Sequence, residues 1–129
     1  MIVLDSSAAV DYVAGLERGQ WVEEQLLADR VVQAPHLLDA EIAGALRKLW
    51  LRGQISDDHA HDAFATFARL SIRRYPHVRL LERVWELRRS VTAADAMYVA
   101  LAEALDAPLV TTDLRLARSH GHRARIVAP

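Results

Sequence analysis

Short apolar runs alternate along this chain with longer segments in which apolar residues recur every three or four positions. Short runs bounded by polar residues are typical of buried strands, and the longer spacing is typical of helices with one apolar face. The pattern predicts strands at Ile2–Leu4, Val31–Ala34, 71–75, Leu109–Thr111 and Ala124–Val127. It predicts helices at Ser6–Val13, Glu17–Ala28, Leu37–Arg52, from 56–58 to about Leu70, Leu80–Arg89, Thr92–Leu105, and from Thr112 or Asp113 to about Ser119. Strands that alternate with helices favour an α/β fold in which a parallel sheet is covered on both faces.

The segment Thr92–Leu105 is apolar on almost every side, which is typical of a helix surrounded by neighbours. Asp95 and Glu103 are the exceptions, and Asp95 shares a helical face with Val99 and Ala102. A buried carboxylate without a partner is costly. Asp95 therefore needs a cation, a set of N–H donors or a proton.

The composition excludes several classes of protein. The chain has 129 residues without a repeat or a linker-like tract, so a single domain over residues 1–129 is expected. It has no cysteine, which excludes disulfides, zinc–thiolate sites and a thiol nucleophile. No stretch resembles a signal peptide or approaches the roughly 20 apolar residues that span a bilayer, so a cytoplasmic protein without membrane association is expected.

The charge is unevenly distributed although the net charge is only −1. Residues 1–68 hold 5 Lys+Arg against 11 Asp+Glu, and residues 69–129 hold 11 against 6. The basic residues of the second half are all arginine, which suits phosphate better than lysine does. The asymmetry is consistent with an anion-binding surface and equally with ordinary solvated helix faces.

Four carboxylates fall at predicted strand ends or helix starts, the edge at which open parallel sheets bind ligands. Asp5 directly follows the first strand, and Asp113 follows the strand 109–111 in the same manner. Glu41 lies in the first turns of its helix, at the border of the apolar stripe. With Asp95, these acids are candidates for chemistry at one side of the sheet.

A structural interpretation is open for each acid taken singly. Asp5 and Asp113 could cap the helices that follow them, and Glu41 could complement a helix N-terminus. Thr92 and Asp95 have the spacing of a capping box. The four positions together are better explained by a shared site.

Clustered carboxylates repel one another unless a divalent cation neutralises them. A ligand set made only of oxygen suits Mg²⁺ or Mn²⁺ rather than zinc. Such ions polarise phosphoryl oxygens and lower the pKa of bound water. Phosphodiester hydrolysis is therefore the predicted reaction class.

Four segments extend this interpretation over the full length of the chain: MIVLDSSA, LLDAEIAGAL, TAADAMYVALAEAL and LVTTDLRLA. In this order and at these intervals they resemble the PIN-domain nucleases, most closely the VapC toxin ribonucleases of bacterial toxin–antitoxin pairs. The resemblance implies a three-layer α/β/α fold with a five-stranded parallel sheet, and a Mg²⁺- or Mn²⁺-dependent endoribonuclease. It also implies a homodimer and a small VapB-like antitoxin that sends a segment into the acidic cleft.

Residue by residue, the resemblance assigns the catalytic, metal-binding quartet to Asp5, Glu41, Asp95 and Asp113. Thr111 matches a frequent hydroxyl of the family, and Ser6 is expected to hydrogen-bond a site carboxylate or water. Some relatives carry the last acid three residues later, where this chain has Leu116. The resemblance therefore leaves open whether Asp113 binds metal directly or through water.

Further residues bear on partners. Arg115 and Arg118 are the preferred partners for RNA phosphates, with solvated helix-end charges as the alternative. Five aromatic residues are candidate interface anchors or ordinary core residues: Trp50, Phe64, Phe67, Tyr75 and Trp85. The rival function is a non-catalytic PIN-like module that binds RNA or protein and keeps the four acids as caps.

Overall fold

The computed structural model describes all residues from Met1 to Pro129. Its strands are β1 (Ile2–Leu4), β2 (Val32–Pro35), β3 (Ile72–Tyr75), β4 (Leu109–Val110) and β5 (Ile126–Val127). They form one sheet in the order β3-β2-β1-β4-β5, and every pair of neighbours is parallel. The predicted five-stranded parallel sheet is confirmed.

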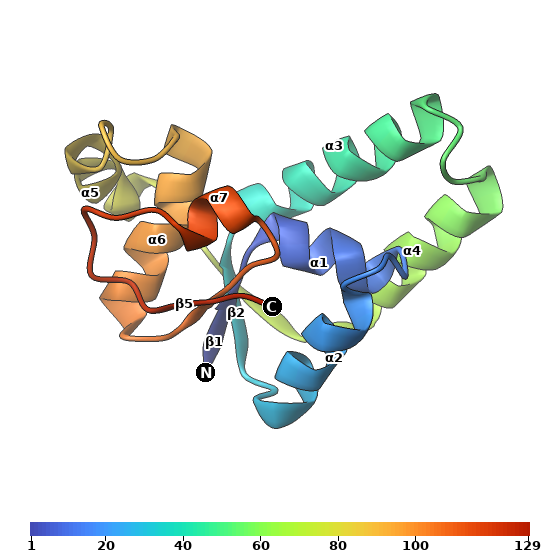
Figure 1. Ribbon diagram of the computed structural model, residues 1–129, viewed down its shortest axis with the longest axis horizontal. Coiled ribbons are helices and arrows are strands. Elements are labelled where there is room, and N and C mark those ends of the chain that lie inside the picture. Colours follow the sequence, from blue (N-terminus) through green and yellow to red (C-terminus); the bar gives the residue numbers. More distant parts are fainter.

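Seven α-helices and one 3₁₀ turn connect and cover the strands. They are α1 (Ser6–Val13), α2 (Gly19–Ala28), α3 (Leu37–Leu51), α4 (Asp57–Arg69), η1 (Val78–Leu80), α5 (Leu81–Glu86), α6 (Ala93–Leu105) and α7 (Leu114–Ala117). In Figure 1, α1 to α4 lie to one side of the strands and α5 and α6 lie to the other. None of these helices combines the length and the apolar character that a membrane span requires.

The central strand β1 contributes to both hydrophobic cores. Ile2 and Leu4 belong to the core formed with α1 to α4, whereas Val3 belongs to the core formed with α5, α6 and α7. This division follows from the alternation of side chains along a strand. Because both faces of β1 are covered, all three residues are buried, which explains why the strand is apolar without alternation.

The path of the chain creates a switch point between β1 and β4. From β1 the chain moves outward through β2 to β3, then returns across the sheet to β4 and continues to β5. The carboxyl ends of β1 and β4 are therefore neighbours although about a hundred residues separate them. In open α/β sheets the crevice at such a point is the usual ligand site.

The observed boundaries differ from the sequence prediction by at most three residues, and two of these differences concern helices α2 and α5. The predicted helix Glu17–Ala28 begins at Gly19, where a Cβ atom would lie 2.5 Å from the carbonyl oxygen of Asp11. Glycine therefore permits the close approach of α2 to α1. The predicted helix Leu80–Arg89 is shorter: α5 ends at Glu86 and the chain continues in turns to Ser90.

Three of the five aromatic candidates lie at the surface. Trp50, Phe64 and Trp85 are 47%, 43% and 68% exposed, so the alternative of ordinary core packing is wrong for them. Phe67 and Tyr75 are partly buried and pack against the two cores. Trp50 and Phe64 line a hollow of about 260 Å³ between α3 and α4.

Candidate active site

Asp5 is the buried member of the predicted quartet. It lies between β1 and α1 with an extended backbone and only 3% of its surface exposed. Its side chain makes no capping hydrogen bond to α1, so the capping interpretation is wrong for Asp5. The carboxylate instead turns toward the end of β4.

Two hydroxyls hold the Asp5 carboxylate at that position. Oδ2 of Asp5 accepts hydrogen bonds from Oγ of Ser7 at 2.5 Å and from Oγ1 of Thr111 at 2.7 Å. The Ser7 oxygen also accepts from the backbone N–H of Thr112 at 3.1 Å, and the two hydroxyls are 3.0 Å apart. This network joins the ends of β1 and β4 through side chains.

Thr111 was predicted as an auxiliary residue, whereas Ser7 was not. The backbone N–H of Ser6 lowers the pKa of Asp5 and so helps to stabilise its ionised form. The Ser6 side chain lowers the pKa of Tyr98, against the larger effects that raise it. The signal in the sequence was the pair of serines after Asp5. Which of the two faces the carboxylate depends on where α1 begins, because successive helical residues differ by about 100°.

Asp113 caps the helix that follows it. Its Oδ1 accepts from the backbone N–H groups of Arg115 at 2.9 Å and Leu116 at 3.4 Å. Its own N–H donates to Oγ1 of Thr111 at 3.0 Å. The capping interpretation is therefore correct for one oxygen of Asp113, while Oδ2 makes no hydrogen bond within the protein.

Asp95 lies at the start of α6 and is only partly exposed. Thr92 is the cap of this helix, because its side chain accepts from the backbone N–H of Asp95 at 3.2 Å. The Asp95 carboxylate makes no hydrogen bond to the N–H of Thr92 in return, so only half of the predicted capping box forms. The Asp95 carboxylate is therefore available to the site.

Glu41 reaches the same region from α3. Its Oε1 accepts a hydrogen bond from the hydroxyl of Tyr98 at 2.7 Å. Tyr98 is completely buried and lies three residues after Asp95, on the same face of α6. That spacing was the signal by which sequence reasoning could have included Tyr98.

Neighbouring acids of the quartet raise the pKa values of Asp5 and Asp95. Burial raises the pKa of Asp5, the hydrogen bonds of Ser7 and Thr111 lower it in part, and the charge of Asp95 raises it further. Burial also raises the pKa of Asp95, Thr92 opposes that shift, and the charges of Asp113 and Glu41 add to it. Asp95 thus interacts electrostatically with each of the other three acids.

The placement of the acidic side chains bears on metal binding. No group of three or more Asp, Glu or His side chains is close enough as placed to hold one metal ion. Asp95 lies within electrostatic range of the other three acids, but the four carboxylates are not arranged as a coordination shell. Among the carboxylate oxygens of the quartet, only Oδ2 of Asp5 and Oδ1 of Asp113 accept hydrogen bonds from more than one donor.

The two predicted RNA-binding arginines lie on and next to α7. Arg115 lines a hollow that also contains Asp95, and its charge lowers the pKa of that acid. Arg118 is the residue at the end of α7 and does not line the hollow. Both guanidinium groups are exposed and neither takes part in an ion pair with a carboxylate.

A parallel sheet with buried and partly buried acids at its switch point agrees with the family assignment from comparison. The family model for the PIN domain matches residues 2–120, and the chain therefore belongs to the PIN-domain family.

Within that family, the chain is a homologue of the VapC ribonucleases. It is 48% identical to Ribonuclease VapC1 of Mycobacterium tuberculosis over 120 residues, which cover 92% of this chain and 90% of the relative. It is 49% identical over 116 residues to Ribonuclease VapC9 of the same organism, covering 90% of this chain and 88% of the relative. With Ribonuclease VapC12 of that organism the identity is 44% over 126 residues, covering 98% and 97%.

Solved structures support the fold. A crystal structure of VapBC2 from Rickettsia felis, bound to a DNA fragment from its promoter, matches with a TM-score of 0.69 and 15% identity, covering 99% of this chain and 98% of that one. The crystal structure of PAE2754 from Pyrobaculum aerophilum matches with a TM-score of 0.66 and 24% identity, covering 98% and 83%. At these identities the likeness concerns the fold alone.

Proposed function

We propose that this protein is the ribonuclease toxin of a VapBC-type pair and hydrolyses RNA phosphodiester bonds with the help of Mg²⁺ or Mn²⁺. The observation that carries the proposal is the burial of Asp5 at the switch point of the sheet, within electrostatic range of Asp95, whose charge raises the pKa of Asp5. Capping alone does not explain this, because Asp5 and Asp95 cap nothing. The identity with VapC ribonucleases over nearly whole chains supports the same function.

The donor chemistry of the site fits a divalent cation. All four acids offer oxygen, which is the ligand type that Mg²⁺ and Mn²⁺ prefer. The quartet Asp5, Glu41, Asp95 and Asp113 would hold the cation. When bound, the cation would neutralise the clustered negative charge and activate water for attack at phosphorus.

Other residues of the chain orient the acids and bind the RNA. Ser7 and Thr111 both donate to Oδ2 of Asp5, so they orient this carboxylate toward the end of β4. Tyr98 restrains one oxygen of Glu41 in the same way. Asp113 combines the cap of α7 with a free Oδ2, which allows it to act directly or through water. Arg115 and Arg118 are proposed partners for RNA phosphates.

A cleavage assay with purified protein tests the proposal. RNA should be cut in the presence of Mg²⁺ or Mn²⁺, and cleavage should stop on addition of EDTA. The Asp5→Asn variant should retain the circular dichroism spectrum of the wild type and lose cleavage. If this variant cuts as fast as the wild type, the catalytic assignment is wrong, and a non-catalytic RNA- or protein-binding module becomes the better explanation.

We further propose a homodimer and a VapB-like antitoxin as partners. The support is the VapC family membership and the fold shared with the VapBC2 complex of Rickettsia felis. Since cellular RNA is the proposed substrate, the cytoplasm is the proposed place of action. Light scattering would measure the oligomeric state. Co-expression with the product of a short reading frame directly upstream should yield a complex without cleavage activity, and free, active toxin under those conditions would contradict the antitoxin proposal.

A further inference from the structure

A hollow of about 340 Å³ opens directly beside the acidic quartet. Asp95 forms one of its walls, so the hollow and the quartet share a residue. The other walls come from the segment after α5, which supplies Arg88 and Arg89, and from α7, which supplies Arg115. Two separate parts of the chain thus bring three arginines to one place.

These three arginines have no carboxylate partner, in contrast to Arg74, Arg83 and Arg123. Arg74 forms an ion pair with Asp39, and Arg83 and Arg123 form ion pairs with Glu103. Arg88, Arg89 and Arg115 form none. Asp95 is the only acid that lines the hollow, so the hollow has an excess of positive charge next to a negatively charged quartet.

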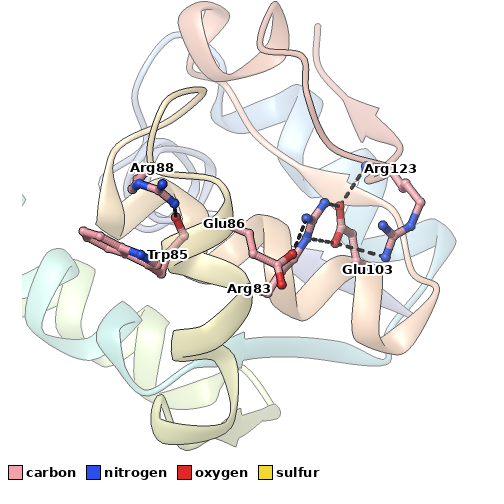
Figure 2. A network of polar contacts seen from close by, with 6 residues as sticks. All are labelled: Arg83, Trp85, Glu86, Arg88, Glu103 and Arg123. Carbon is pink, nitrogen blue, oxygen red and sulfur yellow. Dashed lines mark hydrogen bonds and ion pairs between the residues drawn. The ribbon is translucent and has the colours of Figure 1, made fainter.

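Arg88 is held in place by contacts that do not involve a carboxylate. Its Nη1 donates to the backbone carbonyl of Trp85 at 2.9 Å, and its guanidinium lies 4.6 Å from the centre of the Trp85 ring. Figure 2 shows the two side chains side by side on α5 and the turn that follows it. A guanidinium restrained in this way loses less freedom when it binds a phosphate through its planar fork.

The loop after α7 packs tightly against the segment that follows α5 and lines the hollow. Gly121 has a φ of +86°, and a Cβ atom there would lie 2.4 Å from Oγ of Ser90. Ser90 follows Arg89 directly and also lines the hollow. Glycine at this position therefore keeps the arginine-bearing segment close to α7.

We infer that this hollow binds a backbone phosphate of the RNA strand next to the phosphodiester that is cut, with Arg88, Arg89 and Arg115 as its partners. The inference rests on the proposed ribonuclease function. It adds where the RNA strand lies beyond the acidic quartet. It makes the three arginines positioning residues for RNA rather than participants in bond cleavage.

Binding measured without cleavage tests the hollow by itself. A fluorescein-labelled single-stranded RNA oligonucleotide of mixed sequence is titrated with full-length protein in EDTA, and anisotropy is recorded at several salt concentrations. Each of Arg88→Ala, Arg89→Ala and Arg115→Ala should weaken binding on the order of threefold to tenfold. Each should also reduce the slope of log affinity against log salt by about 0.7, the value for one lost contact to a single strand.

Arg52→Ala is the matched control. Arg52 is an exposed arginine without an ion pair at the end of α3, outside the hollow, and its replacement should leave affinity and slope unchanged. Arg88→Lys, Arg89→Lys and Arg115→Lys should keep the salt slope and retain part of the affinity that the alanine variants lose, because charge is retained without the planar fork. This rescue separates phosphate binding from a merely structural role.

The outcomes distinguish the hollow from the proposed function. If the wild type fails to cut RNA but the three variants bind more weakly than Arg52→Ala, the hollow is supported and the ribonuclease function is not. If the wild type cuts RNA and the three variants bind like the control, the inference about the hollow is overturned. Absence of any measurable binding by the wild type also overturns it.

Discussion

The hydroxyl of Tyr98 donates a hydrogen bond to Oε1 of Glu41 across 2.7 Å and thereby ties α6 to α3 at the acidic crevice. Burial, with the hydrogen bond and charge of Glu41, raises the pKa of Tyr98, so this hydroxyl remains protonated and acts only as a donor. Glu41 itself is partly exposed. One of its oxygens is thus restrained by the core while the other stays accessible.

Replacing Tyr98 with Phe should impair catalysis more than folding. Loss of the hydrogen bond should cost about 1 kcal/mol in free energy of unfolding. A freed Glu41 should lower kcat on the order of tenfold, because small displacements at a reacting centre are costly. Tyr75→Phe is the control, since it removes the hydroxyl that binds Gln33 at 2.5 Å on the edge strand β3. Urea unfolding and single-turnover cleavage measure the two effects, and equal losses of activity in both variants would contradict a specific role for Tyr98.

Removing the charge of Asp95 should not destabilise the protein in the absence of metal. Asp95→Asn relieves repulsion with the other acids, so the melting temperature in EDTA should rise or stay the same. Asp95→Ala should behave alike, because Thr92 rather than the Asp95 carboxylate caps α6. Asp113→Ala provides the contrast: it removes a cap and should cost about 1 kcal/mol. Calorimetry in EDTA would decide, and a clear loss for both Asp95 variants would favour a structural role for that acid.

The same acids should make stability depend on pH in an unusual direction. The folded-state pKa values of Asp5 and Asp95 are raised above 3.8, so between 3.8 and those raised values the native state binds more protons than the unfolded state. Their penalty is fully present above the raised values and is relieved as pH falls through them. The stability advantage of Asp5→Asn over the wild type should therefore be largest at neutral pH and disappear on acidification. Urea unfolding in EDTA across this range measures it, and an advantage independent of pH would contradict the raised pKa values.

Glu103 should behave in the opposite way. Its side chain is 4% exposed and binds Nε and Nη2 of Arg83 at 2.8 and 3.1 Å, and it accepts from the backbone N–H of Arg123 at 2.7 Å (Figure 2). Burial alone would raise the pKa of Glu103, but these partners outweigh it and lower the pKa. Its contribution to stability is therefore present above its ordinary value of 4.5 and is lost as pH falls through the lowered value.

Neutralising Glu103 should accordingly destabilise the protein, whereas neutralising Glu86 should not. Both carboxylates bind Arg83, but Glu86 is 55% exposed. Glu103→Gln should cost roughly 1–3 kcal/mol, because it weakens a nearly buried network that joins α5, α6 and the C-terminal segment. Glu86→Gln should change stability by less than about 0.5 kcal/mol. Equal effects in urea unfolding would show that burial does not distinguish the two carboxylates.

The local pattern of the chain determined most of the secondary structure and the positions of the acids. Apolar runs and helical spacing are local signals, so they located all five strands and placed Asp5 directly after β1 and Asp113 shortly after β4. A parallel sheet then requires these residues to lie at one edge. The shortened α5 was missed, because Leu87 is buried and continues the helical spacing although the chain has already left the helix.

Tertiary structure alone decided which groups meet at that edge. Strand order placed β1 beside β4 and so brought Thr111 to Ser7 and Asp5, from which it is 104 and 106 positions distant and with which it shares no local pattern. The start of α1 made Ser7 rather than Ser6 the donor to Asp5. Likewise the fold joined Tyr98 of α6 to Glu41 of α3, and the turns after α5 placed Arg88 and Arg89 in one hollow with Arg115. Contacts of this kind depend on the relative positions of distant elements, which hydrophobic periodicity does not encode.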